Sequence, residues 1–291
     1  HMPSRRQRQM CIRDRFGLPF LAHRQRCVQA LRSPWTPKTD AIGMDAMPDV
    51  VVLVPTWNEA AVIERRLDNL AAQRIEGLTL REAGVDLMVI DSASEDGTLE
   101  VAETWLSSNP DAFASHVLMP MEERKGKTAA VQLAVARIRE ASPDAIVIMV
   151  DADATCAPHA LQALIRAMGE EDLGALGGRP ERREMTAMEA GHRGLFSWLR
   201  EAESSLGATP FLEGSLMAFR ANLINPESFD VTSNADDAQI ATAIAEQGYR
   251  TAQHPDAIFH DSTPGNIGAR WDQRTRRGRG LIRLLRTKKH V

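Results

Sequence analysis

This 291-residue chain lacks the features of a membrane-spanning protein and of a disulfide-rich protein. No apolar run approaches the ~20 residues that a membrane-spanning helix needs. The three cysteines, Cys11, Cys27 and Cys156, are odd in number and far apart, which argues against a disulfide framework or a zinc site and favours a reducing compartment. We therefore expect a cytoplasmic protein whose cysteines are structural or incidental.

The chain also lacks the phosphate-binding loops of two large nucleotide-binding classes. Lys125-Gly126-Lys127 has no run of glycines before it at the P-loop spacing. The first predicted strand, at residues 50–54, is not followed by the Gly-rich loop with Arg and Lys that sugar nucleotidyltransferases use to hold a triphosphate. Lys127 does stand at the start of a predicted helix, and a helix N-terminus is a natural place for a phosphate group.

Charge is unevenly divided along an otherwise ordinary globular composition of 43% hydrophobic and 25% charged residues. Residues 1–46 carry nine Lys or Arg and three acids, residues 47–265 carry seventeen and thirty-five, and residues 266–291 carry nine and one. The basic ends suggest contact with something anionic, such as a membrane surface, a phosphate-bearing ligand or nucleic acid. For the N-terminal end, a solvated tail explains the charge equally well.

We divide the chain into an N-terminal arm at 1–46, one α/β domain at 47–268 and a basic C-terminal segment at 269–291. The first two residues have the look of a cloning remnant, and residues 3–15 resemble translated adapter sequence, so we expect the arm to be partly non-native. Prolines and a glycine interrupt the rest of the arm, which leaves room for one short helix at about residues 22–31.

The predicted fold is organised around a short strand at residues 146–150. The run is apolar throughout, as expected of a strand buried on both faces, and it ends in Asp151-Ala152-Asp153. Ligands bind at the carboxyl ends of strands in open α/β sheets, and side chains two apart point the same way. The two carboxylates can therefore converge on a hard cation, or on a cation and a sugar hydroxyl. The simpler alternative is an Asp-rich turn that caps a helix beginning near Pro158.

Two further strands are predicted to end at the same edge of the sheet. Residues 50–54 lead to Thr56 and Trp57, and residues 86–90 lead to Asp91. Trp57 is suited to stacking on a nucleotide base, although a Trp so near a core strand is as often simply packed. Asp91 can accept a hydrogen bond from a base N–H or a ribose hydroxyl.

Helices follow these strands, with apolar residues at 3.6-residue spacing. One is predicted from the loop at Glu59 to about Gln73. The helix that follows Lys127 is expected to bury Ala130, Leu133, Ala134 and Ile138. A later helix is expected to pack through Leu195, Trp198, Leu199, Ala202 and Leu206.

The last predicted elements carry two more candidate site residues. A helix at 237–247 begins with Asp237, whose carboxylate suits the positive end of the helix dipole. A strand at 257–259 leads to His260. His260 is either a third metal ligand or, as is more usual for a lone histidine, a hydrogen-bonded structural residue.

These motifs, in this order, resemble those of glycosyltransferase family 2, whose members are inverting enzymes with the GT-A fold. The resemblance extends over about residues 49–279. It rests on Val54-Pro55-Thr56-Trp57-Asn58-Glu59, the segment 91–98, Lys125-Gly126-Lys127, Asp151-Ala152-Asp153, Glu213-Gly214-Ser215 with the segment 217–220, the segment 236–240, and the segment 273–277. Two positions depart from the family pattern. Ser92 stands where a second Asp is common, and Arg277 replaces the Trp of Gln-x-x-Arg-Trp.

The resemblance implies an α/β fold of the GT-A type, a single domain whose mostly parallel central sheet has helices on both faces. One half would be a Rossmann-like nucleotide-binding half, and the other would bind the acceptor. The implied reaction transfers a sugar, with inversion, from a nucleotide-diphosphate sugar, in particular a UDP-sugar, to a hydroxyl of a lipid-linked or polysaccharide acceptor. Mn²⁺ or Mg²⁺ would stabilise the departing diphosphate. Because a fold does not fix a substrate, a non-catalytic nucleotide-sugar-binding protein and a sugar nucleotidyltransferase stay open as alternatives.

The resemblance also assigns roles to individual residues. Asp237, next to Asp236, is the expected general base. Asp153 is the expected principal metal ligand, with Asp151 beside it, and His260 is a third candidate by its position. Donor and nucleoside contacts would fall on Pro55, Thr56, Trp57, Glu59, Asp91, Lys127, Asp151, Ala152 and Asp153. Acceptor and diphosphate contacts would fall on Gly214, Ser215, Gln273, Arg276 and Arg277.

The C-terminal segment alternates arginines with leucine and isoleucine, the pattern of a basic helix lying on an anionic membrane surface. In family members with Gln-x-x-Arg-Trp, this region closes over the donor and is followed by membrane helices. We expect one of two outcomes: peripheral contact with the inner face of the cytoplasmic membrane, or arginines folded inward onto the donor diphosphate. We expect no nucleic-acid partner.

Overall fold

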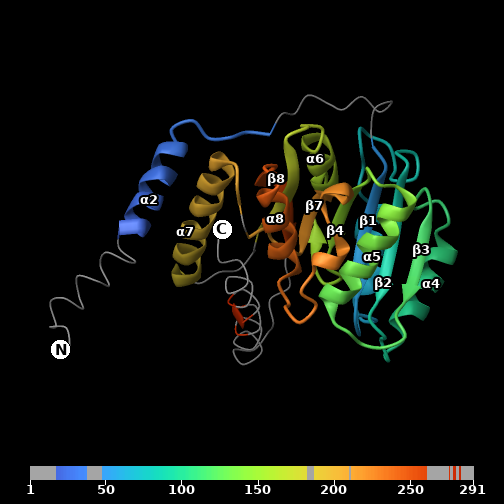
Figure 1. Ribbon diagram of the computed structural model, residues 1–291. Coiled ribbons are helices and arrows are strands. Elements are labelled where there is room, and N and C mark those ends of the chain that lie inside the picture. Colours follow the sequence, from blue (N-terminus) through green and yellow to red (C-terminus); the bar gives the residue numbers. More distant parts are fainter. Residues whose placement is uncertain are drawn as a thin grey trace, which may run out of the picture.

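The computed structural model describes residues 18–37, 48–181, 187–209 and 211–260, together with residues 275, 278, 279 and 282. These residues form one α/β domain around an eight-stranded sheet with strand order β3-β2-β1-β4-β7-β6-β8-β5 (Figure 1). The strands are β1 (Val50–Thr56), β2 (Val85–Asp91), β3 (His116–Pro120), β4 (Ile146–Val150), β5 (Thr155–Cys156), β6 (Leu173–Pro180), β7 (Leu216–Arg220) and β8 (Arg250–His260). The helices are α2 (Leu18–Ala30), α3 (Ile63–Ala71), α4 (Thr98–Ser108), α5 (Lys127–Ala141), α6 (Ala160–Ala167), α7 (Ala187–Leu206) and α8 (Asp236–Glu246), with short 3-10 turns at Ala221–Leu223 and Pro226–Ser228.

The two halves of the sheet differ in strand direction. Neighbours among β3, β2, β1 and β4 are all parallel. In the other half, β7 is antiparallel to both β4 and β6, whereas β8 is parallel to β6 and antiparallel to β5. Four of the seven neighbouring pairs are therefore parallel, which confirms the predicted mostly parallel sheet.

Helices cover both faces of the sheet because its central strands are apolar on both sides. Every residue of β1 is buried. Alternate side chains of β1 belong to two separate apolar layers, with Val52 in one and Leu53 in the other. The first layer also contains apolar residues of α3, α4 and α6, and the second contains those of α5 and α8. These layers hold the helices against the sheet.

Two of the predicted helix faces are partly wrong. In α5, Leu133 is 38% exposed, and the sheet is contacted through Ala130, Val131, Ala134, Val135 and Ile138. In α7, Leu195 is 61% and Leu206 is 46% exposed, although Ala202 is buried. The reason is that α7 packs against α2 and β8 rather than over a broad face of the sheet.

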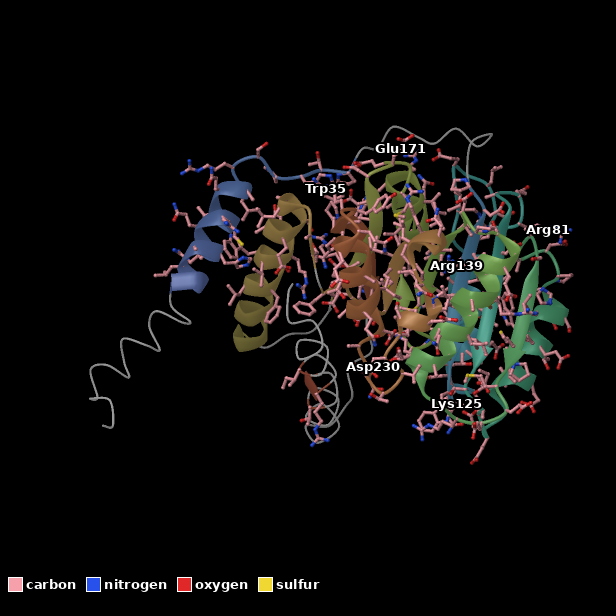
Figure 2. The ribbon with its side chains drawn as sticks, viewed as in Figure 1. Trp35, Arg81, Lys125, Arg139, Glu171 and Asp230 are labelled. Atoms are coloured by element: carbon pink, nitrogen blue, oxygen red, sulfur yellow. The ribbon has the colours of Figure 1, made fainter. Side chains whose placement is uncertain are left out.

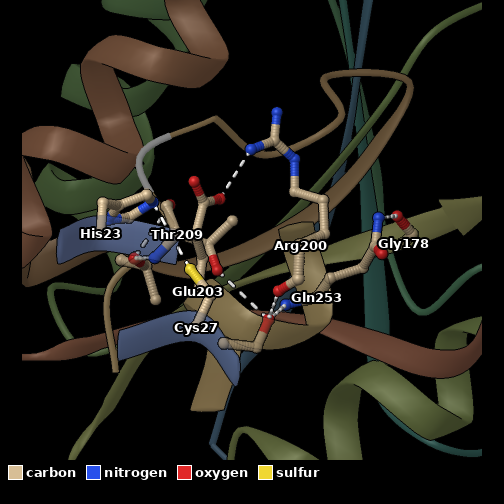
Figure 3. A network of polar contacts seen from close by, with 9 residues as sticks. His23, Cys27, Gly178, Arg200, Glu203, Thr209 and Gln253 are labelled. Carbon is tan, nitrogen blue, oxygen red and sulfur yellow. Dashed lines mark hydrogen bonds and ion pairs between the residues drawn. The ribbon is translucent and has the colours of Figure 1, made fainter. Parts of the chain in front are cut away.

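The end of the molecule that holds α2 and α7 is built from polar contacts as well as apolar ones (Figure 3). The predicted helix of the N-terminal arm is confirmed as α2, which packs beside α7. Cys27 of α2 is fully buried, and its Sγ lies 3.5 Å from His23 Nε2. Within α7, Arg200 donates to a Glu203 carboxylate oxygen at 2.8 Å. Burial raises the pKa of the Cys27 thiol, as expected of a structural cysteine.

Two of the predicted helices begin slightly later than expected. The helix predicted from Glu59 begins at Ile63, because the residues before it form a turn. The helix predicted near Pro158 begins at Ala160. None of the described helices combines the length and the apolar composition needed to cross a bilayer.

The carboxyl ends of β1, β2 and β4 meet at one edge of the sheet. Thr56, the last residue of β1, pairs with Asp91, the last residue of β2. In Figure 2, Lys125 marks this edge, and Arg81 and Glu171 lie toward the opposite edge. The polar residues that the sequence singles out are therefore collected on one side of the domain.

Candidate active site

Asp91 ties the ends of β1 and β2 together. Its side chain is buried, and one carboxylate oxygen, Oδ1, accepts from the Thr56 hydroxyl at 2.9 Å and from the Ser94 hydroxyl at 2.6 Å. The other oxygen accepts from the Ser94 N–H at 2.7 Å. Asp91 thus lies at the site, as predicted, but its described hydrogen bonds are made to the protein and give it a supporting role.

Hydrogen bonds join the loop after β1 to the loop after β2, with backbone N–H groups of the first donating to side chains of the second. The Ala60 N–H donates to Asp96 Oδ2 at 3.0 Å, and the Glu59 N–H donates to the Thr98 hydroxyl at 2.9 Å. These bonds fix the backbone of Glu59 beside the acidic loop after β4. Burial and the charges of Asp153 and Asp151 raise the pKa of the Glu59 carboxyl to about 7.

Trp57 presents its ring to solvent rather than to the core. It is 40% exposed, and the Arg124 guanidinium stacks on it with 3.4 Å between the guanidinium carbon and the ring centroid. The alternative that Trp57 is packed in the core is therefore wrong. Arg124 was not identified from the sequence. Its place beside Lys125-Gly126-Lys127, in a loop that leads to this edge, was the signal that could have found it.

Asp151 is held at every polar atom of its backbone and side chain. Its N–H donates to the Ser215 carbonyl at 3.2 Å, and its carbonyl accepts from Arg66. In its carboxylate, Oδ1 accepts from Lys127 Nζ at 2.6 Å and Oδ2 from the Ser215 hydroxyl at 3.1 Å. The turn after β4 is thus prearranged, with Ala152 buried between the two acids and Pro55 placed within the neighbouring strand β1.

Lys127 connects the turn after β4 to the start of α8. Its Nζ lies 2.6 Å from Asp151 Oδ1 and 3.3 Å from Asp236 Oδ2. Burial alone would lower the pKa of this ammonium, but the charges of Asp151 and Asp236 outweigh burial and raise it. Lys127 is therefore a permanent cation at the centre of an acidic cluster.

Asp236 and Asp237 open α8 in a poorly solvated position. The Asp236 side chain is 5% exposed. Burial, followed by the negative charge of Asp236, raises the pKa of Asp237 to about 7, although Lys127 acts in the opposite direction. Asp237 Oδ1 accepts from the Ala238 N–H at 2.7 Å. Asp237 can therefore exist in both protonation states near neutral pH.

The segment Glu213-Gly214-Ser215 lies between the two acidic groups. Ser215 contacts Asp151, as described above. A Cβ placed on Gly214 would lie 3.1 Å from Asp237 Oδ2, so a larger residue would press on that carboxylate. Sequence reasoning placed Gly214 and Ser215 at the site, and the structure brings both of them to it.

The donor atoms at this edge fit a hard divalent cation. Mg²⁺ is commonly held by one or two carboxylates and completed by substrate phosphates. Asp151 and Asp153 supply carboxylates, and Glu59 is close enough for their charges to shift its pKa. Within the described part of the chain, no three acidic, histidine or cysteine side chains are gathered in ligand geometry. The set therefore suits a cation that a bound diphosphate completes.

Of the remaining predicted site residues, His260 has no described bond to this cluster, and three others lie outside the described ranges. His260 ends β8 opposite Thr155, two positions after Asp153, and its Nδ1 lies 3.1 Å from the Glu181 carbonyl oxygen. The residues Gln273, Arg276 and Arg277 lie outside the described residues.

Arg66 is a second residue that sequence reasoning missed. It lies on α3 and donates to the Asp151 carbonyl from Nε at 2.9 Å and from Nη2 at 2.7 Å. Its position in the apolar stripe of α3, between Ile63 and Leu70, was the available signal, because a charged residue at a core position of a helix needs a reason.

Comparisons with known proteins agree with this geometry. The model of the family described as Glycosyl transferase family 2 matches residues 51–225. The chain is 23% identical over 255 residues to the poly-beta-1,6-N-acetyl-D-glucosamine synthase of Staphylococcus aureus (strain COL), covering 85% of this chain and 58% of that protein. The chain thus spans little more than half the length of this curated relative.

Solved structures give the same assignment. A mannosyltransferase from Pyrobaculum calidifontis, in complex with GDP-Man and Mn²⁺, superposes with a TM-score of 0.75 at 31% identity, covering 93% of this chain and 71% of that one. TarS of S. aureus, in complex with UDP-GlcNAc, has a TM-score of 0.54 at 16% identity, covering 75% of this chain and 59% of that one, which supports the fold alone. The mixed α/β domain is thus of the GT-A type. Because the family model covers more than half of its residues, the chain belongs to glycosyl transferase family 2.

Proposed function

We propose that this protein transfers a sugar, with inversion, from a nucleotide-diphosphate donor to a hydroxyl group, with the help of a divalent cation. The observation that carries the proposal is the bridge made by Lys127, which joins Asp151 to Asp236. The carboxylates suited to a metal and the carboxylate suited to proton transfer therefore lie in one cluster. An inverting transfer needs both kinds close together.

Asp237 is the general base in this proposal. A base works best when its pKa lies near the operating pH, and the pKa of Asp237 is raised to about 7. In its ionised form it takes the proton of the acceptor hydroxyl while that oxygen attacks the anomeric carbon. Gly214 supports this role because it leaves the space beside Asp237 Oδ2 open.

The opposite side of the cluster would hold the donor diphosphate. α5 begins at Lys127 and has no side-chain cap on its first N–H groups, which favours an anion at that end. Asp153 and Asp151 would hold Mn²⁺ or Mg²⁺, which supplies positive charge that stabilises the leaving diphosphate. The exposed ring of Trp57, under Arg124, is the proposed stacking surface for the base.

The donor is proposed to be a UDP-sugar, with a GDP-sugar as the second candidate. The first choice is supported by the relative named as an N-acetyl-D-glucosamine polymer synthase and by the fold neighbour bound to UDP-GlcNAc. The mannosyltransferase bound to GDP-Man and Mn²⁺ supports the second. That complex also supports Mn²⁺ as the cation.

The acceptor is proposed to be a hydroxyl of a polysaccharide or of a lipid-linked saccharide. The relative named as a polymer synthase supports a saccharide acceptor. The nine basic residues of the segment 266–291 support contact with the inner face of the cytoplasmic membrane, where such acceptors would be reached.

The proposal is tested in two stages. A thermal-shift screen of UDP, GDP and their sugars, each with and without Mn²⁺, should raise the melting temperature most for one donor plus Mn²⁺, because only ligands of the folded state stabilise it. Incubation of that donor with saccharide acceptors should then release a nucleoside diphosphate. Release of pyrophosphate from a nucleoside triphosphate supplied with a sugar 1-phosphate would instead indicate a nucleotidyltransferase, and binding without turnover in either assay would indicate a binding protein.

A further inference from the structure

Arg66 is an unusual core residue. It is 1% exposed and is among the largest fully buried side chains of the protein. It occupies the buried stripe of α3 together with Ile63, Leu67 and Leu70, where an apolar residue would be expected. A buried cation costs several kcal/mol unless the protein compensates it.

The hydrogen bonds of Arg66 go to neutral atoms. Nε and Nη2 both donate to the carbonyl oxygen of Asp151, at 2.9 and 2.7 Å. Nη1 donates to Asn69 Oδ1 at 2.9 Å and lies 3.5 Å from Cys156 Sγ. Two of these four contacts are therefore made with the backbone of the turn after β4, both with the same carbonyl oxygen.

Asn69, one turn after Arg66 on α3, holds the other end of the same segment. Its Oδ1 accepts from the Cys156 N–H at 2.8 Å, and its Nδ2 donates to the Cys156 carbonyl at 2.9 Å. α3 thus fixes the segment 151–156 at both ends, and Asp153 lies between the two fixed points. The arrangement resembles the outer groups that orient ligand residues in metal sites.

Arg66 contacts the turn through the Asp151 carbonyl and not through the Asp151 carboxylate. That carboxylate accepts from Lys127 and Ser215 instead. Arg66 therefore fixes the backbone of the turn and leaves the side chain of Asp151 to the cluster on the other side.

We propose that Arg66 is a positioning residue for the metal site, which orients the turn 151–156 so that Asp151 and Asp153 present their carboxylates to a divalent cation. This inference rests on the proposed metal-dependent function. Arg66 touches neither the metal nor the donor, and it acts through the Asp151 carbonyl.

The test compares Arg66→Lys with a matched control, Arg220→Lys. Arg220 makes the same kind of contact, donating to the carbonyls of Leu173, Met168 and Glu170 at 2.7 to 2.9 Å. It lies at the end of β7 that pairs with Ile146, the first residue of β4, at the opposite edge of the sheet from the acids. In both variants lysine keeps the positive charge of arginine but lacks the planar group that donates two hydrogen bonds side by side.

Two affinities are measured for each variant: that of Mn²⁺ in the presence of saturating UDP, by electron paramagnetic resonance of the free ion, and that of UDP in EDTA. We expect Arg66→Lys to weaken Mn²⁺ binding about 10-fold, the lower end of the range for such outer groups, with the metal-free affinity for UDP unchanged. Arg220→Lys should lower the melting temperature and leave the affinity for Mn²⁺ as in the wild type.

The outcomes separate this inference from the proposed function. If the wild type binds Mn²⁺ and Arg66→Lys binds it equally well, Arg66 only fills space and this inference alone is overturned. If the wild type binds no Mn²⁺ with UDP or GDP present, both proposals are overturned. Should Arg66→Lys fail to fold, Asn69→Ala takes its place, because it releases the segment at Cys156 and should weaken Mn²⁺ binding several-fold. Unchanged Mn²⁺ binding in that variant would also contradict the inference.

Discussion

The aspartates of the candidate site differ in how many hydrogen bonds they accept, as a comparison of Asp91 with the pair Asp236 and Asp237 shows. Asp91, at the end of β2, is buried and accepts three hydrogen bonds from the hydroxyl and N–H groups around it. Asp236 and Asp237, at the start of α8, have little such support. Among the described residues, Asp236 Oδ2 has an ion pair with Lys127 and no hydrogen bond. The pKa of Asp237 is raised to about 7.

The difference separates structural support from proton chemistry. A carboxylate that accepts several hydrogen bonds is stabilised in its charged form and holds its neighbours in place. A carboxylate that is buried beside another acid is destabilised in its charged form and is ready to take a proton. The comparison therefore predicts that similar substitutions at the two places will have different consequences.

The largest expected effect comes from Asp237→Asn. The amide keeps the shape of the side chain but cannot take a proton, so turnover should fall by about 10² to 10⁴-fold with the affinity for the donor retained. Steady-state kinetics with a saturating donor measure this. Near-normal turnover would mean that the base lies elsewhere.

Asp237→Asn should also differ from the wild type in how its stability changes with pH. The raised pKa means that the folded state binds the Asp237 proton more tightly than the unfolded state does, so the wild type loses stability as the pH rises from about 4 to about 7. Asp237→Asn removes this loss. It should therefore melt no lower than the wild type at pH 8, which distinguishes a catalytic defect from a folding defect.

Asp91→Asn should reverse this pattern, with a loss of stability. One carboxylate oxygen becomes an NH₂ group, which cannot accept, so at least one of the three donors around Asp91 loses its acceptor at a cost of about 1–3 kcal/mol. Chemical denaturation measures the loss. The control is Asp111→Asn, whose side chain is 83% exposed and pairs with Arg81, where a change within about 0.5 kcal/mol is expected. If Asp91→Asn and Asp111→Asn were equally stable, Asp91 would have no structural role.

The smallest expected effect is a shift of the pH profile. Because Asp237 must be ionised to act, kcat/KM should rise with pH through a midpoint near 7. The charge of Asp236 raises this pKa, and Asp236→Asn removes that charge while Lys127 still acts in the opposite direction, so the midpoint should move to lower pH by about one unit. A midpoint that stays in place would assign the titration to another group, such as Glu59, whose pKa is also about 7.

The strands β1, β2 and β4 and the end of β8 could be predicted from the sequence, whereas β3 and β6 could not. The continuous apolar runs of β1, β2 and β4 identify strands buried on both faces. β3 is an edge strand with no fully buried residue, and β6 contains three glycines, so neither has a strong pattern. Two of those glycines are needed for packing: a Cβ on Gly174 would lie 2.3 Å from Ile244, and one on Gly178 would lie 2.8 Å from the Ala257 carbonyl.

At the site, the sequence identified the acids but not their environments. Asp151, Asp236 and Lys127 were placed in separate motifs, and the contacts that join them depend on how three loops meet. The contact of Asp91 with the nucleoside stays a prediction, and the sequence did not show that Asp91 also joins two strand ends. Arg66 was missed because it bonds to a backbone carbonyl. Every residue has such a carbonyl, so no residue type in the sequence marks the partner.

The central claim is that the acids after β4 bind a divalent cation together with a nucleoside diphosphate. The most direct measurement is isothermal titration of UDP and GDP, with Mn²⁺ and with EDTA, on the wild type, Asp153→Ala and the control Asp144→Ala. Asp144 precedes β4 at the opposite edge, where it accepts from the Asn222 amide at 2.9 Å. We predict Mn²⁺-dependent binding in the wild type and in Asp144→Ala, and its loss in Asp153→Ala. Equal Mn²⁺-dependent affinity in Asp153→Ala and the wild type would contradict the account.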